Sequence, residues 1–161
     1  MKNLTMIAAI GKNNELGKGN ELIWKIKEDL QFFKEKTLNK DIVMGYNTFK
    51  SLPGLLPKRK HIILTRKNIE IDNTLVIHTK EELLDYIINK EEEIFIIGGE
   101  ALYTQMLDYA SKMYLTEIDD YCKDADKFYP KFNKEEWDRT ILSSHKTDDN
   151  ISYKHLVYRR K

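Results

Sequence analysis

The chain has 161 residues, of which 41% are hydrophobic and 33% are charged, so it is long enough for one well-buried core and too short to suggest two domains. Its 27 basic and 26 acidic side chains leave a formal net charge of +1, which excludes the strongly basic surface of nucleic-acid-binding proteins. The single cysteine, Cys122, excludes an intramolecular disulfide, and no cluster has the spacing of metal ligands. We therefore expect one domain over residues 1–161 that binds a small molecule and neither nucleic acid nor metal.

The sequence shows no segment expected to enter a membrane. The N-terminal apolar run ends at Ile10, which is too soon for a signal peptide, and no other run approaches membrane-spanning length. We therefore expect a cytoplasmic protein with no membrane partner. Because no large apolar stripe is left unassigned, we also expect a monomer.

Five apolar runs have the pattern of strands buried on both faces of a parallel sheet. They are Leu4–Ile10, Ile42–Met44, His61–Leu64, Leu75–Ile77 and Ile94–Ile97. Helical spacing falls between them, at Lys25–Lys36, Glu81–Asn89 and Glu100–Tyr109, with a short turn at Thr48–Leu52. This alternation predicts an α/β fold with about four helices.

The pattern changes after Tyr109, because three further strands follow without a convincing helix between them. They are Met113–Ile118, Thr140–Ser144 and Tyr153–Tyr158. The last two should form an antiparallel hairpin around Asp148–Asn150. The sequence thus predicts a mixed, mostly parallel central sheet of about eight strands.

Asp29 is an acid on the apolar face of the first predicted helix, where Ile26, Leu30 and Phe33 recur at helical spacing. Burying a carboxylate costs several kcal/mol, as an order of magnitude, unless hydrogen bonds compensate, and a ligand with N–H donors would supply them. The alternative is an acid favoured only by the positive helix N-terminus. The preceding stretch favours a ligand, because Gly11, Gly17, Gly19 and Trp24 are typical of a lid.

Three predicted strands end in sequences suited to a phosphorylated ligand. Gly98-Gly99 would let the backbone approach an anion, Gly45 leads to the potential cap Thr48, and Thr65-Arg66 suits a ribose 2′-phosphate. Because ligands of open α/β sheets lie beyond the carboxyl ends of strands, we expect a phosphorylated cofactor across this edge. The alternatives are tight packing at the glycines and a solvated basic turn.

Two further side chains suit a substrate that carries a carboxylate. Arg59 follows the leucine-rich loop of Leu52, Leu55 and Leu56, where a guanidinium can clamp a carboxylate beside an apolar spacer. Thr116 lies within a predicted strand, where its hydroxyl can steady a buried acid. Taken alone, Arg59 would be a surface cation and Thr116 an ordinary strand residue.

From about Leu4 to its C-terminus the chain resembles bacterial dihydrofolate reductases. The matching landmarks keep their order and spacing: Ile7-Ala8-Ala9, Leu16-Gly17, Trp24 with Asp29-Leu30 and Phe33, Met44-Gly45 with Thr48-Phe49, Leu56-Pro57 with Arg59-Lys60, Ile97-Gly98-Gly99 with Tyr103, and Tyr114-Leu115-Thr116 with Ile118-Asp119. The resemblance implies a single-domain dihydrofolate-reductase-like fold. It also implies reduction of 7,8-dihydrofolate to tetrahydrofolate, with hydride passing from NADPH to C6 of the pterin and a proton added at N5.

The resemblance assigns roles to individual residues. Asp29 would hold the pterin's 2-amino group and N3, Thr116 would hold Asp29, and Leu22 and Trp24 would belong to a lid that excludes water. The implied residues binding dihydrofolate or an antifolate are Ile7, Asp29, Leu30, Phe33, Leu52, Leu56, Arg59 and Thr116. The implied NADPH-binding residues are Ala9, Leu16, Gly17, Gly45, Tyr46, Asn47, Thr48, Leu64, Thr65, Arg66, Ile97, Gly98, Gly99, Glu100, Ala101, Leu102 and Tyr103.

Three positions depart from the common bacterial pattern. Ile23 stands where a proline usually precedes the tryptophan, Tyr46-Asn47 replaces a frequently basic pair, and Glu100 stands where a third glycine is frequent. Arg66 would therefore carry more of the NADPH preference. The alternatives to dihydrofolate reduction are a related pterin or pyrimidine reductase, such as the riboflavin-pathway reductase domains, and a non-catalytic pterin-binding module.

Overall fold

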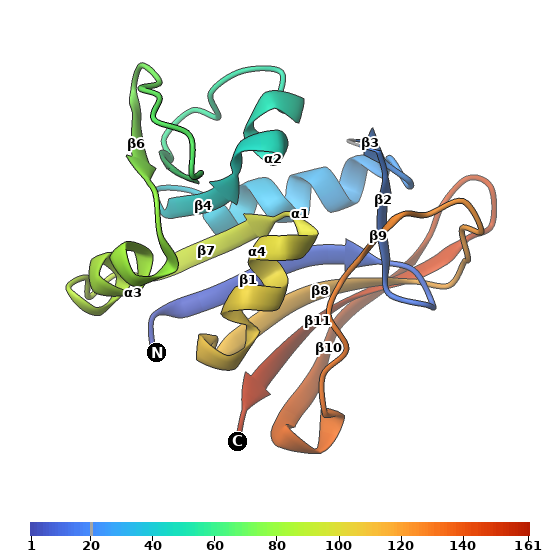
Figure 1. Cartoon of the computed structure of the whole chain (residues 1–161). Coiled ribbons are helices and arrows are strands. Elements are labelled where there is room, and N and C mark those ends of the chain that lie inside the picture. The colour runs from blue at the N-terminus through green and yellow to red at the C-terminus, as the bar shows by residue number, and fades with distance from the viewer. Residues whose placement is uncertain (20) are drawn as a thin grey trace.

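An eight-stranded sheet runs through the centre of the computed structural model, which describes residues 1–19 and 21–161 (Figure 1). The strand order is β10-β11-β8-β1-β7-β4-β5-β6. The bounds are β1 Leu4–Ile10, β4 Asp41–Gly45, β5 Lys60–Leu64, β6 Thr74–Ile77, β7 Ile94–Gly98, β8 Lys112–Ile118, β10 Trp137–Lys146 and β11 Ser152–Arg160. The six strands from β8 to β6 are parallel, whereas β11 and β10 are antiparallel to their neighbours. The predicted mixed α/β sheet is therefore confirmed.

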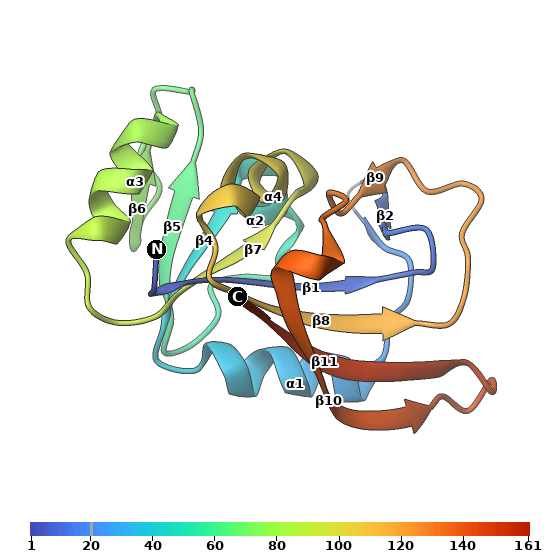
Figure 2. The ribbon, with the colours of Figure 1, turned by 90° about the horizontal axis from the view of Figure 1, so that it is seen from below.

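Helices cover both faces of this sheet. Their bounds are α1 Lys27–Thr37, α2 Tyr46–Ser51, α3 Lys80–Ile88 and α4 Glu100–Met106, followed by the short 3₁₀ helix η1 Leu107–Tyr109. Figure 2 shows α1 on one side of the sheet and α3 and α4 on the other. The described helices are not long and apolar enough to cross a bilayer. The predicted number of helices is confirmed, although α1 begins two residues later than the spacing indicated.

Alternation along the central strands produces two hydrophobic clusters. In β4, Val43 belongs to the cluster beneath α3 and α4, whereas Ile42 and Met44 belong to the cluster beneath α1 and α2. Phe95 of β7 likewise packs with the second cluster, between Ile94 and Ile96 in the first. Because successive side chains of a strand point to opposite faces, a fully apolar run serves both layers.

A second, three-stranded sheet of order β3-β2-β9 was not predicted. It joins β2 Glu15–Lys18 and β3 Glu21–Leu22, from the glycine-rich segment, to β9 Lys127–Phe128. Figure 1 shows it beside the carboxyl end of β1. Strands this short carry little periodicity, and β2 finds its β9 partner more than a hundred residues along the chain. A short 3₁₀ helix, η2 Lys134–Glu136, precedes β10.

Two neighbouring residues of α3 test the packing of the first cluster. Ile87 is fully buried, whereas Ile88 is 69% exposed. Ile87→Ala should lower the free energy of unfolding by about 2–5 kcal/mol because it leaves a cavity, and Ile88→Ala should change it by less than about 0.5 kcal/mol. Urea unfolding of both variants checks this, and equal losses would contradict the assigned packing of α3.

Candidate active site

A cleft of about 2220 Å³ opens where the parallel strands end. The sequence-predicted site residues other than Arg59 line it: Ile7, Ala9, Leu16, Gly17, Leu22, Trp24, Asp29, Leu30, Phe33, Gly45, Tyr46, Asn47, Thr48, Leu52, Leu56, Leu64, Thr65, Arg66, Ile97, Gly98, Gly99, Glu100, Ala101, Leu102, Tyr103 and Thr116. The cleft also includes residues that sequence reasoning missed, notably His78, Lys80 and Lys127.

The Asp29 carboxylate lies where α1 meets the sheet. Its Oδ1 accepts a hydrogen bond from the Thr116 hydroxyl of β8, and it lies 3.3 Å from Nε2 of His155 on β11. The side chain is 23% exposed. Within residues 1–19 and 21–161, Oδ2 has no protein hydrogen-bond partner. One oxygen is therefore fixed by the protein, and the other remains available to a ligand with N–H donors.

Helix α1 places Asp29 through its apolar face and its charge distribution. Phe32 and Phe33 pack against the second cluster, and Asp29 lies one turn before Phe33 on that side. Glu28 and Asp29 occupy the first turn, where the helix dipole favours acids, and basic residues occupy the last turn.

His155 is a part of this site that the sequence did not reveal. His155, a residue of β11, is only 4% exposed and stacks on Phe32 with ring centroids 4.0 Å apart. The available signal was its position in the strand, because Tyr153, His155 and Val157 alternate with residues of the other face.

The glycine-rich segment, described at residues 11–19 and 21–24, is hydrogen-bonded to the loop that follows β8. The Trp24 indole N–H donates to Asp120 Oδ2 at 3.0 Å, and the Gly19 amide donates to Asp126 Oδ1 at 2.9 Å. The hydrogen bond from Trp24 holds the pKa of Asp120 below its usual value. A Cβ at Gly11 would lie 2.4 Å from the Trp24 ring, so this close approach requires glycine.

The Gly98-Gly99 turn follows β7 with a cis peptide bond and a φ of +130° at Gly98. A Cβ on Gly99 would meet Thr48 Oγ1 at 3.3 Å, so the two strand-end turns lie against each other. Below them, the buried Tyr103 hydroxyl donates to the Ile7 carbonyl at 2.6 Å, and burial raises its pKa. The turn is thus rigidly supported while its backbone borders the cleft.

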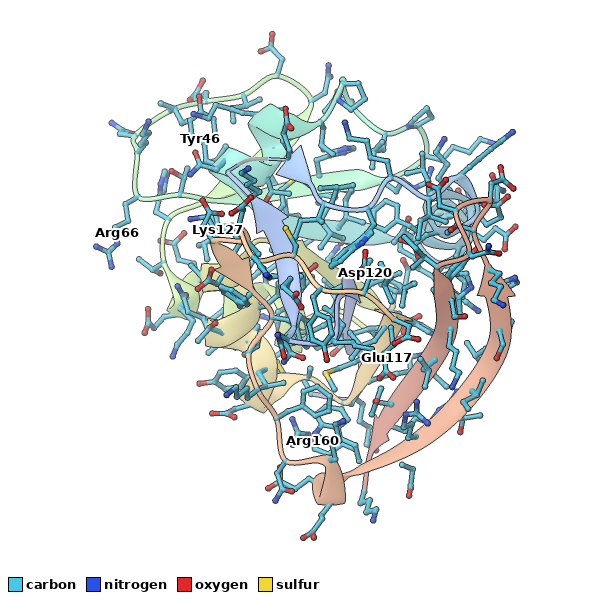
Figure 3. The ribbon with its side chains drawn as sticks, turned by 90° about the vertical axis from the view of Figure 1, so that its right-hand side faces the viewer. Tyr46, Arg66, Glu117, Asp120, Lys127 and Arg160 are labelled. Carbon is cyan, nitrogen blue, oxygen red and sulfur yellow. The ribbon has the colours of Figure 1, made fainter. Side chains whose placement is uncertain are left out.

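Cations from separate elements border this same part of the cleft. Arg66 follows β5, Lys80 begins α3 and Lys127 lies in β9. Figure 3 shows Arg66 projecting outward from the molecule, with Tyr46 and Lys127 nearer its centre. Glu100 is engaged elsewhere, because its Oε2 accepts the Phe128 amide at 3.1 Å. The exposed cations Arg66 and Lys127, the partly buried Lys80 and the glycine turn fit an elongated, phosphorylated cofactor.

Arg59 is held by the protein just outside the lining of the cleft. Its Nε donates to Thr37 Oγ1 at 3.1 Å, and its two terminal nitrogens donate to the carbonyls of Pro57 and Lys34. A guanidinium has five N–H donors, so two remain after these three contacts. The side chain is therefore fixed in place while it retains donors for an anion.

Comparisons with known proteins agree on one family. A family model described as dihydrofolate reductase matches residues 3–160. The chain is 35% identical to the dihydrofolate reductase of Haemophilus influenzae over 159 residues, which cover 98% of both chains. It is 34% identical to that of Bacillus subtilis over 162 residues, which cover 98% of this chain and 95% of the other.

The solved structures include a similar protein. This is the dihydrofolate reductase of Enterococcus faecalis complexed with NADP(H) and RAB-propyl, with a TM-score of 0.87 and 29% sequence identity. The match covers 98% of this chain and 96% of the other.

The contact between Trp24 and Asp120 should protect the glycine-rich segment from solvent. Asp120→Ala removes the acceptor of the indole N–H, so amide hydrogen exchange in a peptide covering Glu15–Lys18 should become faster. Asp124→Ala is the matched control, because the Asp124 side chain is 77% exposed and its ion pair with Lys18 is long, at 3.7 Å. Hydrogen exchange measured by mass spectrometry checks this prediction. Identical exchange rates in the two variants would contradict a stabilising role for the Trp24–Asp120 hydrogen bond.

Proposed function

The chain belongs to the dihydrofolate reductase family, and we propose that its cleft holds 7,8-dihydrofolate beside NADPH for reduction to tetrahydrofolate. The observation that carries this proposal is the Asp29 carboxylate at the wall of the cleft, with Oδ1 held by Thr116 and no hydrogen-bond partner for Oδ2 among the described residues. NADPH supplies, when bound, the hydride that is added at C6 of the pterin. The two alternative functions find no support in the comparisons.

Asp29 orients the pterin and favours its reactive form. Its carboxylate accepts hydrogen bonds from the pterin's 2-amino group and N3, and its negative charge stabilises the cation formed when N5 takes a proton from water. Thr116 is a positioning residue, because its hydroxyl fixes the rotamer of Asp29. Leu22 and Trp24 cover the reacting atoms and exclude bulk water, which strengthens the effect of the Asp29 charge.

The rest of the substrate lies along the apolar wall between α1 and the loop after α2. Ile7, Leu30, Phe33, Leu52 and Leu56 line this slot and suit the pterin and aminobenzoyl rings. Arg59 binds the glutamate α-carboxylate with its two remaining N–H donors. The same slot accepts antifolates, since they share the flat, donor-bearing ring of the substrate.

NADPH would occupy the other half of the cleft. Ala9, Leu16 and Gly17 would hold its nicotinamide, and Gly98, Gly99 and Tyr103 would hold its middle. Gly45–Thr48 with Thr65 and Arg66 would hold the adenosine phosphates, and Lys80 and Lys127 would add positive charge. The protein works as a cytoplasmic monomer.

Asp29→Asn tests the central role. The amide keeps the size of the side chain but removes its charge, so turnover at neutral pH should fall by about 10²-fold or more, while NADPH binding and the fold remain unchanged. Glu28→Gln is the control, because Glu28 is an exposed acid in the same helical turn. Dihydrofolate-dependent loss of NADPH absorbance measures turnover, and undiminished activity of Asp29→Asn would contradict the role.

Arg66→Ala tests the cofactor preference. Removing the guanidinium should raise the KM for NADPH by about 10-fold to 100-fold, because a charge-assisted hydrogen bond is lost, and leave the KM for NADH unchanged. Arg159→Ala is the control, since Arg159 is an exposed guanidinium on β11 and does not line the cleft. Equal losses with both cofactors would show that Arg66 does not bind the 2′-phosphate.

A further inference from the structure

His155 is a buried titratable side chain that the proposed reduction does not use. It is 4% exposed and lies 3.3 Å, Nε2 to Oδ1, from Asp29. The Phe32 ring stacks on it at an interplanar angle of 11°, which fixes the plane of the imidazole. A histidine held in this way beside a functional carboxylate has an orientation suited to proton transfer.

The strand register places His155 between two hydroxyl side chains. Thr116 of β8 pairs with His155 of β11, and His155 pairs with Ser143 of β10. The last pairing depends on an irregularity between Ile141 and Ser143, since without it Leu142 would stand opposite His155. Directly paired side chains lie on the same face of a sheet, which here is the face covered by α1.

A continuous line of polar atoms leads from Asp29 to the surface. Nδ1 of His155 lies 3.3 Å from Ser143 Oγ, which lies 2.8 Å from Nε2 of His145. His145 is exposed near the end of β10, two residues from Ser143 and so on the same face. One assignment of protons satisfies every contact: His145 donates to Ser143, Ser143 donates to His155, and His155 donates to Asp29.

We propose that His145, Ser143 and His155 form a proton path that connects Asp29 to solvent beside the β10–β11 hairpin. When His145 takes up a proton at Nδ1, its Nε2 proton passes to Ser143 Oγ. The Ser143 hydroxyl proton passes to Nδ1 of His155, and the His155 Nε2 proton passes to Asp29 Oδ1. One proton enters, one arrives, and the path requires no electron donor or acceptor.

The path rests on the proposed function and adds a second route by which protons reach Asp29 from solvent without passing through the cleft. In the proposed complex, the pterin and the segment carrying Trp24, which both border the cleft beside Asp29, would separate the carboxylate from bulk water on that side. His155 reaches the same carboxylate from the opposite side, so Asp29 exchanges protons with solvent while the cleft is covered. The reduction consumes one proton at N5 in each turnover. In the proposal, protonated Asp29 gives its proton to the water that protonates N5 and returns to the carboxylate, and the path then replaces that proton.

The groups around His155 come from four elements. Asp29 and Glu28 belong to α1, Thr116 to β8, Ser143 and His145 to β10, and Tyr153 to β11. Burial, with the carboxylates of Glu28 and Asp29, raises the pKa of Tyr153, so its phenol stays neutral in the working range. On the far side of Phe32, the Lys36 ammonium lies 5.5 Å from the ring centroid.

Two adjacent serines give a matched kinetic test. Ser143 lies in the path, whereas Ser144 is exposed and points to the other face of β10. In single turnovers on the alkaline side of neutrality, where protons are scarce, Ser143→Ala should slow NADPH oxidation by about tenfold and Ser144→Ala should not. On the acid side the two variants should match the wild type. Identical pH profiles for both serine variants would overturn the proposal.

Imidazole added to His145→Ala gives a readout that a structural role would not change. Because His145 is exposed, free imidazole can occupy its place, and it should restore the alkaline rate in this variant. Imidazole should have no effect on Ser143→Ala, because the hydroxyl missing from that variant lies between the two histidines. Absence of rescue in His145→Ala would overturn the path.

Nitrogen NMR of the ligand-free protein tests the proton order without any turnover. The path requires Nδ1 of His155 to be an acceptor and Nε2 to carry the proton, and the ¹⁵N shifts distinguish the two tautomers. Ser143→Ala should shift the Nδ1 resonance of His155, and Ser144→Ala should not. A neutral His155 protonated at Nδ1 would overturn the path, whereas absence of NADPH oxidation by the wild type would instead contradict the proposed function.

Discussion

The hydrogen bond from Thr116 to Asp29 joins helix α1 to the sheet, and the site is organised around it. A carboxylate at this boundary needs hydrogen-bond donors, because it is partly removed from water and no neighbouring cation fully neutralises its charge. Thr116 and His155 supply partners for Oδ1 from two adjacent strands. Oδ2 is left without a partner among the described residues, so the contact that fixes the position of α1 also leaves one carboxylate oxygen available at the wall of the cleft.

The charge needed for a phosphorylated cofactor is a local property of this chain. The whole sequence is almost neutral, yet Arg66, Lys80 and Lys127 come from three separate elements to one part of the cleft. The opposing charge of Glu100 is moderated by its hydrogen bond to the Phe128 amide. Composition therefore does not reveal where an anion binds, and only the fold brings these cations to the cleft.

Long, strongly patterned elements were predictable from the sequence, and so was the central acid. The apolar runs of β1, β4 and β7 identify buried strands, and the helical spacing around Asp29 identifies its face. The small sheet was not predictable, because β2 and β9 are short and pair across a long stretch of chain. His155 was missed for a similar reason: nothing local to the strand indicates that a carboxylate from α1 lies against it. Periodicity reports which face a residue occupies, but not which distant residue it meets.

The partners of Asp29 also determine when the site can exist during synthesis. Thr116 lies 87 residues after Asp29 in the chain, and His155 lies 126 residues after it. A ribosome releases the chain from its N-terminus, and β11, which carries His155, is the last strand of the sheet. A nascent chain that already contains Gly98 and Gly99 at the wall of the cleft therefore still lacks the full environment of the Asp29 carboxylate. The setting of Asp29 is therefore completed only when the last strand joins the sheet, and that same strand also supplies Leu156 and Tyr158 to the hydrophobic core.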